Sequence, residues 1–229
     1  MTGRELKKYR KDSKLTQERA AKLLGVSQTY LSLLENGERP LNMRLRKKAV
    51  AAFGLSPTEL PSKARYLKID PVTDEQLTVD LATLGYKGFS HYKPSRQKNP
   101  ADVLLSALNA DNRDARLIEA LPWLVLAFPD MEWHDVKRVV KMYDLQNRLG
   151  FVLSVALGLA EQRQDKSTAA TLSRREADLV PSMLVREGTL CNDKMTNAER
   201  RWLATNRTDD ARRWRILASL SPQLVRYAD

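Results

Sequence analysis

Side chains that could perform acid–base or metal chemistry are scarce in this sequence. The 229 residues include two histidines, His91 and His134, and one cysteine, Cys191. A single cysteine excludes an intramolecular disulfide and a zinc site made of cysteines. Glu132, His134 and Asp135 lie close together and could act as acid and base. The acid-rich start of a helix explains them as well, and we favour that interpretation. We expect no catalytic residue, no metal and no cofactor.

A larger set of side chains could bind nucleic acid through positive charge and hydrogen bonds. The chain has 39 Lys and Arg against 28 Asp and Glu, a net charge of +11. Such an excess indicates a polyanionic partner, nucleic acid before a membrane. The first 60 residues hold 13 basic and 6 acidic residues, whereas the remaining 169 hold 26 and 22. The sequence therefore divides into a small basic part and a larger, nearly balanced part.

No segment is predicted to cross a membrane or to direct secretion. The N-terminus, MTGRELKKYRKDSK, lacks the apolar core of a secretory signal. The most apolar stretch runs from Leu149 to Ala160, twelve residues. About 20 are needed to span a bilayer, so this stretch is predicted to be a buried helix. We expect a cytoplasmic, nucleoid-associated protein with no membrane partner.

Residues 15–37, LTQERAAKLLGVSQTYLSLLENG, have the spacing of two helices joined by a sharp turn. Thr16 is a good N-cap for the first helix, and Ser27 for the second. Gly25 can adopt the positive φ that reverses the chain between them. A small residue, a glycine four positions later, and apolar residues six and nine positions beyond the glycine predict a helix-turn-helix.

Three further helices are predicted around this pair. One precedes it at residues 5–11, and one follows at residues 41–53. A short helix is predicted from Ser56, which begins a capping box with Pro57 at the first helical position. Together the five helices predict one small domain, residues 1–62.

This pattern resembles the DNA-binding domain of the phage repressor and Cro (Xre-type) family. The resemblance rests on the joint spacing of three segments and covers the first 60 residues: Thr16-Gln17-Glu18, Gly25-Val26-Ser27-Gln28 and Glu35-Asn36-Gly37. It implies that Gln28, the first residue of the recognition helix, hydrogen-bonds to adenine. It also implies that Gln17 braces that side chain and donates to a phosphate.

The resemblance assigns roles to further residues of the domain. It implies DNA contacts, some to bases and some to phosphates, at Gln17, Ser27, Gln28, Thr29, Tyr30, Ser32, Leu33, Asn36, Arg39 and Arg44. Leu33 departs from the polar residues frequent at its position, so the recognised sequence stays open. Arg10 and Glu35 match a family pair that forms an internal ion pair. For Lys47 and Lys48, a solvated basic face is nearly as good an explanation as phosphate contact.

The rest of the chain divides into a linker and a helical domain. Proline and glycine punctuate residues 63–100, which are predicted to be a linker that could contain a short helix starting at Thr73. Residues 101–229 carry apolar residues at helical spacing and two further helix-start patterns, beginning at Ser173 and Thr196. Their tryptophans are expected to be core anchors, although an exposed one would suit an interface.

The sequence thus predicts an all-α protein. We expect a sequence-specific DNA-binding regulator, a homodimeric repressor of its own operon that binds double-stranded DNA at a pseudo-palindromic operator through residues 1–62. Residues 101–229 would dimerise or hold a partner protein or a ligand.

Two alternatives remain open. The first is an antitoxin that represses its operon and neutralises a toxin. Residues 141–161, KMYDLQNRLGFVLSVALGLAE, faintly resemble tails of Xre-type regulators encoded beside nucleotidyltransferase-like toxins. The second, less favoured, is an enzyme that acts on nucleic acid with residues 1–62 as a targeting module. The sequence has neither GxxxxGK[ST] nor GxGxxG, the glycine-rich loops that bind phosphates.

Overall fold

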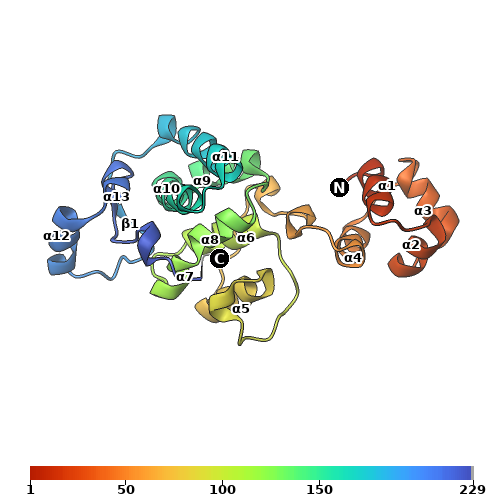
Figure 1. Cartoon of the computed structure of the whole chain (residues 1–229), viewed down its shortest axis with the longest axis horizontal. Coiled ribbons are helices and arrows are strands. Elements are labelled where there is room, and N and C mark those ends of the chain that lie inside the picture. The colour runs from red at the N-terminus through yellow and green to blue at the C-terminus, as the bar shows by residue number, and fades with distance from the viewer. Residues whose placement is uncertain (228–229) are drawn as a thin grey trace. The chain divides into compact units, whose positions relative to one another are not determined.

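The fold is almost entirely helical. A computed structural model describes residues 1–227, in which thirteen α-helices and two strands of two residues each occur (Figure 1). The predicted all-α fold class is confirmed. The chain divides into two compact units, Met1–Pro61 and Ser62–Asp229, each with its own apolar core.

The unit Met1–Pro61 contains four α-helices and a final 3₁₀ turn at Pro57–Glu59. The helices are α1 (Gly3–Asp12), α2 (Gln17–Leu24), α3 (Gln28–Glu35) and α4 (Met43–Phe53). Each begins after a residue whose side chain accepts a backbone N–H, namely Thr2, Thr16, Ser27 and Asn42. Four predicted helices are present, and the fifth is shortened to a single 3₁₀ turn.

The core of this unit receives apolar side chains from every helix. Its buried members are Leu6, Ala20, Ala21, Leu24, Leu31, Leu34, Leu41, Leu45, Ala49 and Phe53. Gly3 lets α1 approach α3 closely, because a Cβ at this position would lie 1.9 Å from the carbonyl oxygen of Leu34. Backbone contact at that distance is impossible, so this crossing requires glycine.

The unit Ser62–Asp229 holds the remaining helices and both strands (Figure 1). Its helices are α5 (Asp74–Leu84), α6 (Pro100–Leu108), α7 (Ala115–Glu119), α8 (Leu121–Ala127), α9 (Trp133–Met142), α10 (Gln146–Gln162), α11 (Lys166–Ala177), α12 (Asn197–Asn206) and α13 (Asp209–Arg213). Its strands, β1 (Gly188–Thr189) and β2 (Ile216–Leu217), pair in parallel. Further 3₁₀ turns lie at Ala64–Tyr66, Lys87–Phe89, Val180–Ser182 and Pro222–Leu224.

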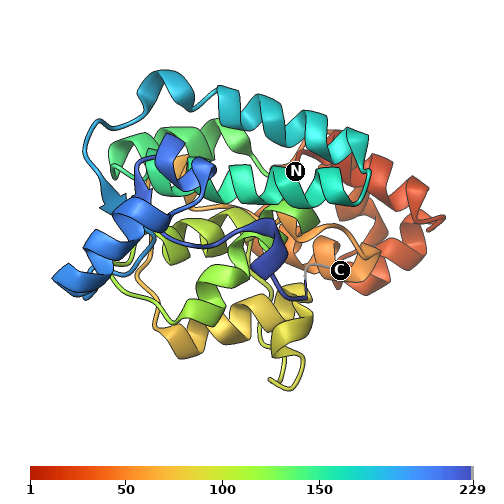
Figure 2. The same ribbon diagram turned by 60° about the vertical axis from the view of Figure 1, so that its left-hand side comes forward.

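Helix α10 is the centre of the second unit. It packs against α8 on one side and runs beside α11 on another (Figures 1 and 2). Its residues 149–156 are all buried, which is why this stretch is so apolar. No described helix has the length and apolar character needed to cross a membrane.

The C-terminal part of this unit is fastened to α10 and α11 by a buried polar cluster. The Trp214 indole N–H donates to the Ser154 hydroxyl at 2.8 Å and to the Glu176 carboxylate at 3.0 Å. The Ser154 hydroxyl donates to the same carboxylate oxygen at 2.6 Å, and Arg213 pairs with that oxygen at 3.0 Å. Trp214 is fully buried against Gly150.

Residues 63–100 belong to the second unit rather than to a linker. The expected short helix is α5, capped by Thr73, and its leucines Leu77, Leu81 and Leu84 are buried in the core of that unit. The proline and glycine residues that suggest a linker here mark the loops around α5. The structure places the boundary between the two units at Pro61.

Two further details differ from the sequence patterns. Residues 133–162 have helical spacing of apolar residues along their whole length, but they form two helices, because the chain turns at Asp144, which has φ of 58°. The pattern beginning at Ser173 lies inside α11, which starts earlier with Asp165 as its cap. By contrast, Thr196 caps α12 with a complete capping box, as its pattern predicts.

Candidate nucleic-acid interface

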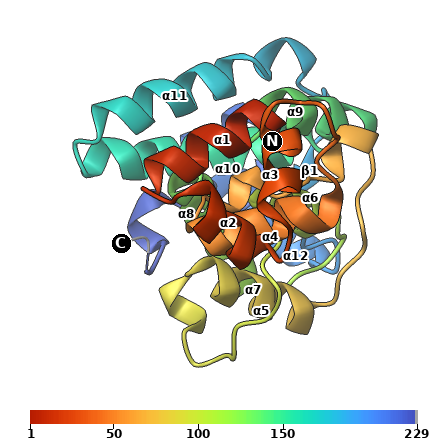
Figure 3. The ribbon, with the colours of Figure 1, turned by 90° about the vertical axis from the view of Figure 1, so that its right-hand side faces the viewer.

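Helices α2 and α3 form a pair joined by a tight turn, visible in Figure 3. The Thr16 hydroxyl accepts from the Arg19 N–H at 3.2 Å, which starts α2. Gly25 ends α2 at φ of 69°, a conformation that favours glycine. The Ser27 hydroxyl accepts from the Tyr30 N–H at 3.1 Å and starts α3. Local hydrogen bonds therefore set where the second helix of the pair begins.

Lys48, in α4, hydrogen-bonds to the end of α2 at the turn between α2 and α3. Its ammonium group donates to the Leu24 carbonyl oxygen at 2.9 Å, one of the carbonyls left free at the end of α2. A Cβ on Gly25 would lie 3.0 Å from the same ammonium group. Lys48 therefore holds the turn of the helix pair, a role that neither sequence interpretation of this residue includes.

A buried ion pair fixes α3 to α1. The Arg10 guanidinium donates to both carboxylate oxygens of Glu35, at 2.6 and 2.9 Å. It also donates to the Leu15 carbonyl oxygen at 2.9 Å. Arg10 is 7% exposed and Glu35 only 1%. The structure thus brings together the two residues that the family resemblance pairs.

The Gln17 side chain hydrogen-bonds to this ion pair and not to Gln28. Its side-chain N–H donates to a Glu35 carboxylate oxygen at 2.9 Å. Burial alone would raise the pKa of Glu35, but the hydrogen bonds from Arg10 and Gln17 outweigh it and hold this pKa below its usual range. Gln17 is half-buried at the start of α2, and its contact in the protein alone differs from the bracing of Gln28 that the resemblance implies.

The remaining predicted DNA contacts lie in or around α3. Ser27, Gln28 and Thr29 are exposed at its N-terminal end, and Tyr30, Ser32 and Leu33 are half-buried. Asn36 caps the C-terminal end, and its side-chain amide donates to Glu38 at 3.4 Å. Arg39 follows α3 and Arg44 lies in the first turn of α4, and both are exposed. The α3 N-terminus thus offers three adjacent polar side chains to a ligand.

The residues considered for acid–base chemistry lie at the start of α9. Glu132 is its N-cap residue, and Asp135 lies in its first turn. His134 is exposed on the same turn. In the described part of the chain, no three His, Cys, Asp or Glu side chains are arranged to hold a metal ion.

Comparison with known proteins identifies the class of the first unit. Residues 6–60 match the family model described as helix-turn-helix. No curated protein and no solved structure gives a significant match. The N-terminal unit is a helix-turn-helix domain of the Xre/Cro type. The match covers 55 of the 229 residues and supports a DNA-binding regulator of the Xre type.

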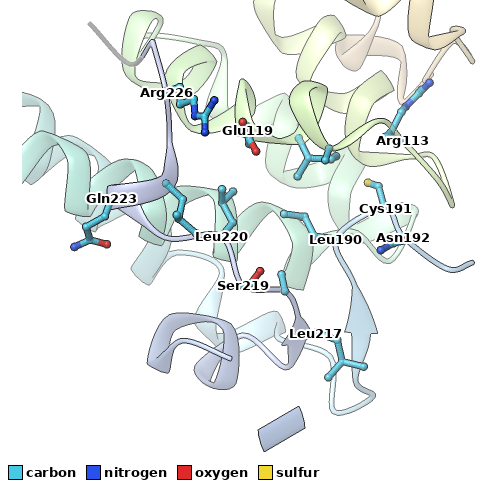
Figure 4. A pocket seen from close by; sticks show the side chains of 14 residues that line it. Arg113, Glu119, Leu190, Cys191, Asn192, Leu217, Ser219, Leu220, Gln223 and Arg226 are labelled. Carbon is cyan, nitrogen blue, oxygen red and sulfur yellow. The ribbon is translucent and has the colours of Figure 1, made fainter. Parts of the chain in front are cut away.

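The second unit contains a cavity of about 390 Å³ that sequence analysis missed (Figure 4). Its apolar lining includes Leu190, Leu217 and Leu220, and its charged lining includes Glu119 and Arg226. The volume lies within the range of small-ligand sites, about 300–1,000 Å³. No local motif could predict this cavity, because its walls come from segments about residues 113–119, 190–192 and 217–226.

Proposed function

We propose that this protein is a homodimeric repressor that binds a pseudo-palindromic operator in its own operon. The observation that carries the proposal is the N-terminal end of α3, where Gln28 and Thr29 are exposed on a helix fixed by the Arg10–Glu35 ion pair. A helix held this rigidly can place its polar side chains against base edges in the major groove. We propose no catalytic role for any part of the chain.

In this proposal the residues around α3 divide into two groups. Gln28 and Thr29 read bases, with Ser32 and Leu33 on the same helix adding contacts to base edges. Ser27, Tyr30, Asn36, Arg39 and Arg44 bind phosphates and set the register. Gln17 keeps Glu35 in place, and its amide can additionally donate to a phosphate.

The repressor proposal is tested by selection of bound duplexes from random DNA, followed by a search for the selected sequence upstream of the protein's own gene. A reporter under that promoter should be silenced when the protein is supplied. A selected sequence without two-fold symmetry, or a reporter that the protein activates, would contradict the proposal.

Replacement of Gln28 by alanine should weaken specific operator binding without loss of the fold, because this side chain is exposed. We expect a loss of about 1–3 kcal/mol in operator binding, with discrimination relaxed at one base pair per half-site. Fluorescence anisotropy with matched and single-substituted duplexes measures both. Asn36→Ala is the matched control, since loss of a phosphate contact should weaken all sequences about equally. An unchanged base preference in Gln28→Ala would show that α3 is not the recognition helix.

The dimer is expected to form through the second unit, since 26 basic and 22 acidic residues in 62–229 leave little charge to oppose self-association. Joining two helix-turn-helix domains in one dimer raises the avidity for the operator by about 10²–10⁴ over that of a single domain. Sedimentation equilibrium should give twice the 26.1 kDa chain mass for the whole protein, a dimer for residues 62–229 and a monomer for residues 1–61. A monomeric fragment 62–229 together with a dimeric fragment 1–61 would contradict dimerisation through the second unit.

A second candidate function is favoured by one exposed side chain. Trp123, Trp133 and Trp214 are buried as expected, but Trp202 on α12 is 59% exposed. Exposed tryptophans are frequent anchors of protein interfaces. An antitoxin would use such an anchor to hold its toxin. A toxin gene next to the gene of this protein would support this function. So would cell growth that the wild-type chain restores in the presence of the toxin and that Trp202→Ala does not.

A further inference from the structure

The loop between α5 and α6 carries the net charge of the second unit. Residues 81–101 contain Lys87, Lys93, Arg96 and Lys98 and no acidic residue. Their charge of +4 equals the excess of 26 basic over 22 acidic residues in the whole of 62–229. The rest of this unit holds 22 basic and 22 acidic residues in total. The net positive charge of the unit therefore equals the charge of this one segment.

Three of these cations are free to bind a ligand. Lys87, Lys93 and Arg96 are exposed, and no ion pair or side-chain hydrogen bond engages them within residues 1–227. Elsewhere in the unit, many arginine side chains already make ion pairs or hydrogen bonds within the protein. Arg113 pairs with Asp74 at 2.7 Å, and Arg148 donates to the Leu108 carbonyl oxygen at 2.8 Å.

The loop is held in a defined shape. Lys98 pairs at 2.6 Å with Asp80, whose carboxylate is buried and also accepts from Gln76 at 2.8 Å. The Ser95 N–H donates to the Thr83 hydroxyl at 2.8 Å. Between these anchors, residues 90–97 are all exposed, and the segment extends from α5 as a long loop (Figures 1 and 2).

Two rings stand among the cations. The His91 and Tyr92 rings lie 4.4 Å apart between centroids, and Tyr92 is 41% exposed. A tyrosine hydroxyl is a common hydrogen-bond donor to phosphate oxygens. Hence residues 87–97 present basic groups and one phenolic donor, and contain no acidic residue of their own that would repel an anion.

We propose that the loop of residues 87–97 binds the phosphate backbone of double-stranded DNA, in addition to the contacts made by the helix-turn-helix domain. This inference rests on the proposed function, because the domain tethers the chain to DNA and so raises the local concentration of phosphates. A membrane is a poorer partner, since electrostatic binding to lipid headgroups uses clusters of about four to eight basic residues, and the pairing of Lys98 with Asp80 leaves three. The loop reads no bases, so it adds affinity without sequence preference.

The salt dependence of binding tests this inference in the full-length protein. The triple variant Lys87→Ser, Lys93→Ser, Arg96→Ser should make the negative slope of log affinity against log salt shallower by about 2.7 per loop, at about 0.9 for each lost contact. The affinity ratio between 50 and 200 mM salt should then fall about 40-fold for each loop that contacts the duplex. The selected operator and a random duplex should lose affinity to the same extent.

A matched variant removes equal charge elsewhere in the unit. Lys141, Lys166 and Lys194 are exposed, and each lies within three residues of an acid, so Lys141→Ser, Lys166→Ser, Lys194→Ser should leave the slope nearly unchanged. Circular dichroism should show that both variants are folded.

Equal slopes for wild type and the loop variant would overturn the inference while leaving operator binding, and thus the proposed function, intact. Loss of binding to phosphatidylserine vesicles with no change on DNA would also overturn it. If wild type bound no duplex at all, the proposed function itself would fail.

Discussion

Replacement of Arg10 by alanine is expected to destabilise the helix-turn-helix domain by about 3–5 kcal/mol. The substitution leaves the Glu35 carboxylate buried with only Gln17 to donate to it. An uncompensated buried charge costs far more than the loss of a surface contact. Urea unfolding followed by circular dichroism measures the effect. Tryptophan fluorescence isolates the second unit, since all four tryptophans lie after residue 61.

The double variant Arg10→Met, Glu35→Leu serves as the control, because removal of both charges should cost much less than removal of one. The pH dependence is a second readout. Glu35 has a lowered pKa in the folded state, so its contribution is present above the unfolded value of 4.5 and is lost as the pH falls through the folded value. Glu35→Gln should lose this acid sensitivity. Equal stability of Arg10→Ala and wild type would show that the pair does not hold α3.

Replacement of Trp214 by alanine is expected to destabilise the second unit by about 3–5 kcal/mol. The substitution empties the space beside Gly150 and removes the indole donor from Ser154 and Glu176. Unfolding followed by the fluorescence of the remaining tryptophans measures the loss. Trp214→Phe separates the two causes, because it restores most of the ring volume but not the donor. A loss below about 1 kcal/mol would contradict the burial of this residue.

The reverse change at the same contact is an independent check. In Gly150→Ala, the added Cβ would lie 2.3 Å from two atoms of the Trp214 ring. The ring is fully buried and its N–H is hydrogen-bonded, so overpacking should destabilise the unit by about 1–3 kcal/mol or more. Gly37→Ala in the first unit is a comparison variant, because the added Cβ would have no atom within 4 Å. It measures the effect of replacing a glycine without a clash, together with the local strain of an alanine at φ of 80°.

The helix-turn-helix could be predicted because its determinants are local. Thr16 and Ser27 accept hydrogen bonds from residues three positions away, and Gly25 marks the turn by its own backbone preference. The family resemblance then paired Arg10 with Glu35. The contacts of Gln17 and Lys48 were missed, because each depends on groups far along the chain that meet only in the folded domain.

The second unit was less predictable for the same physical reason. Its helical periodicity was visible, but the break at Asp144 has no glycine or proline to mark it. The burial of α5 could not be read from loops rich in proline and glycine, since burial depends on partners in α6 and elsewhere. A serine followed by a glutamate three positions later also occurs in helix interiors, as Ser173 shows.

The burial of the one cysteine makes the natural chain suitable for site-specific labelling. The Cys191 thiol is fully buried, and burial raises its pKa to about 11. At pH 7 about one molecule in ten thousand would carry the reactive thiolate, against a few per cent for an ordinary cysteine. A cysteine introduced at an exposed position would therefore take up a maleimide dye selectively, with the native thiol left in place. One dye on each unit would report the distance between the two units in solution by energy transfer, with and without DNA.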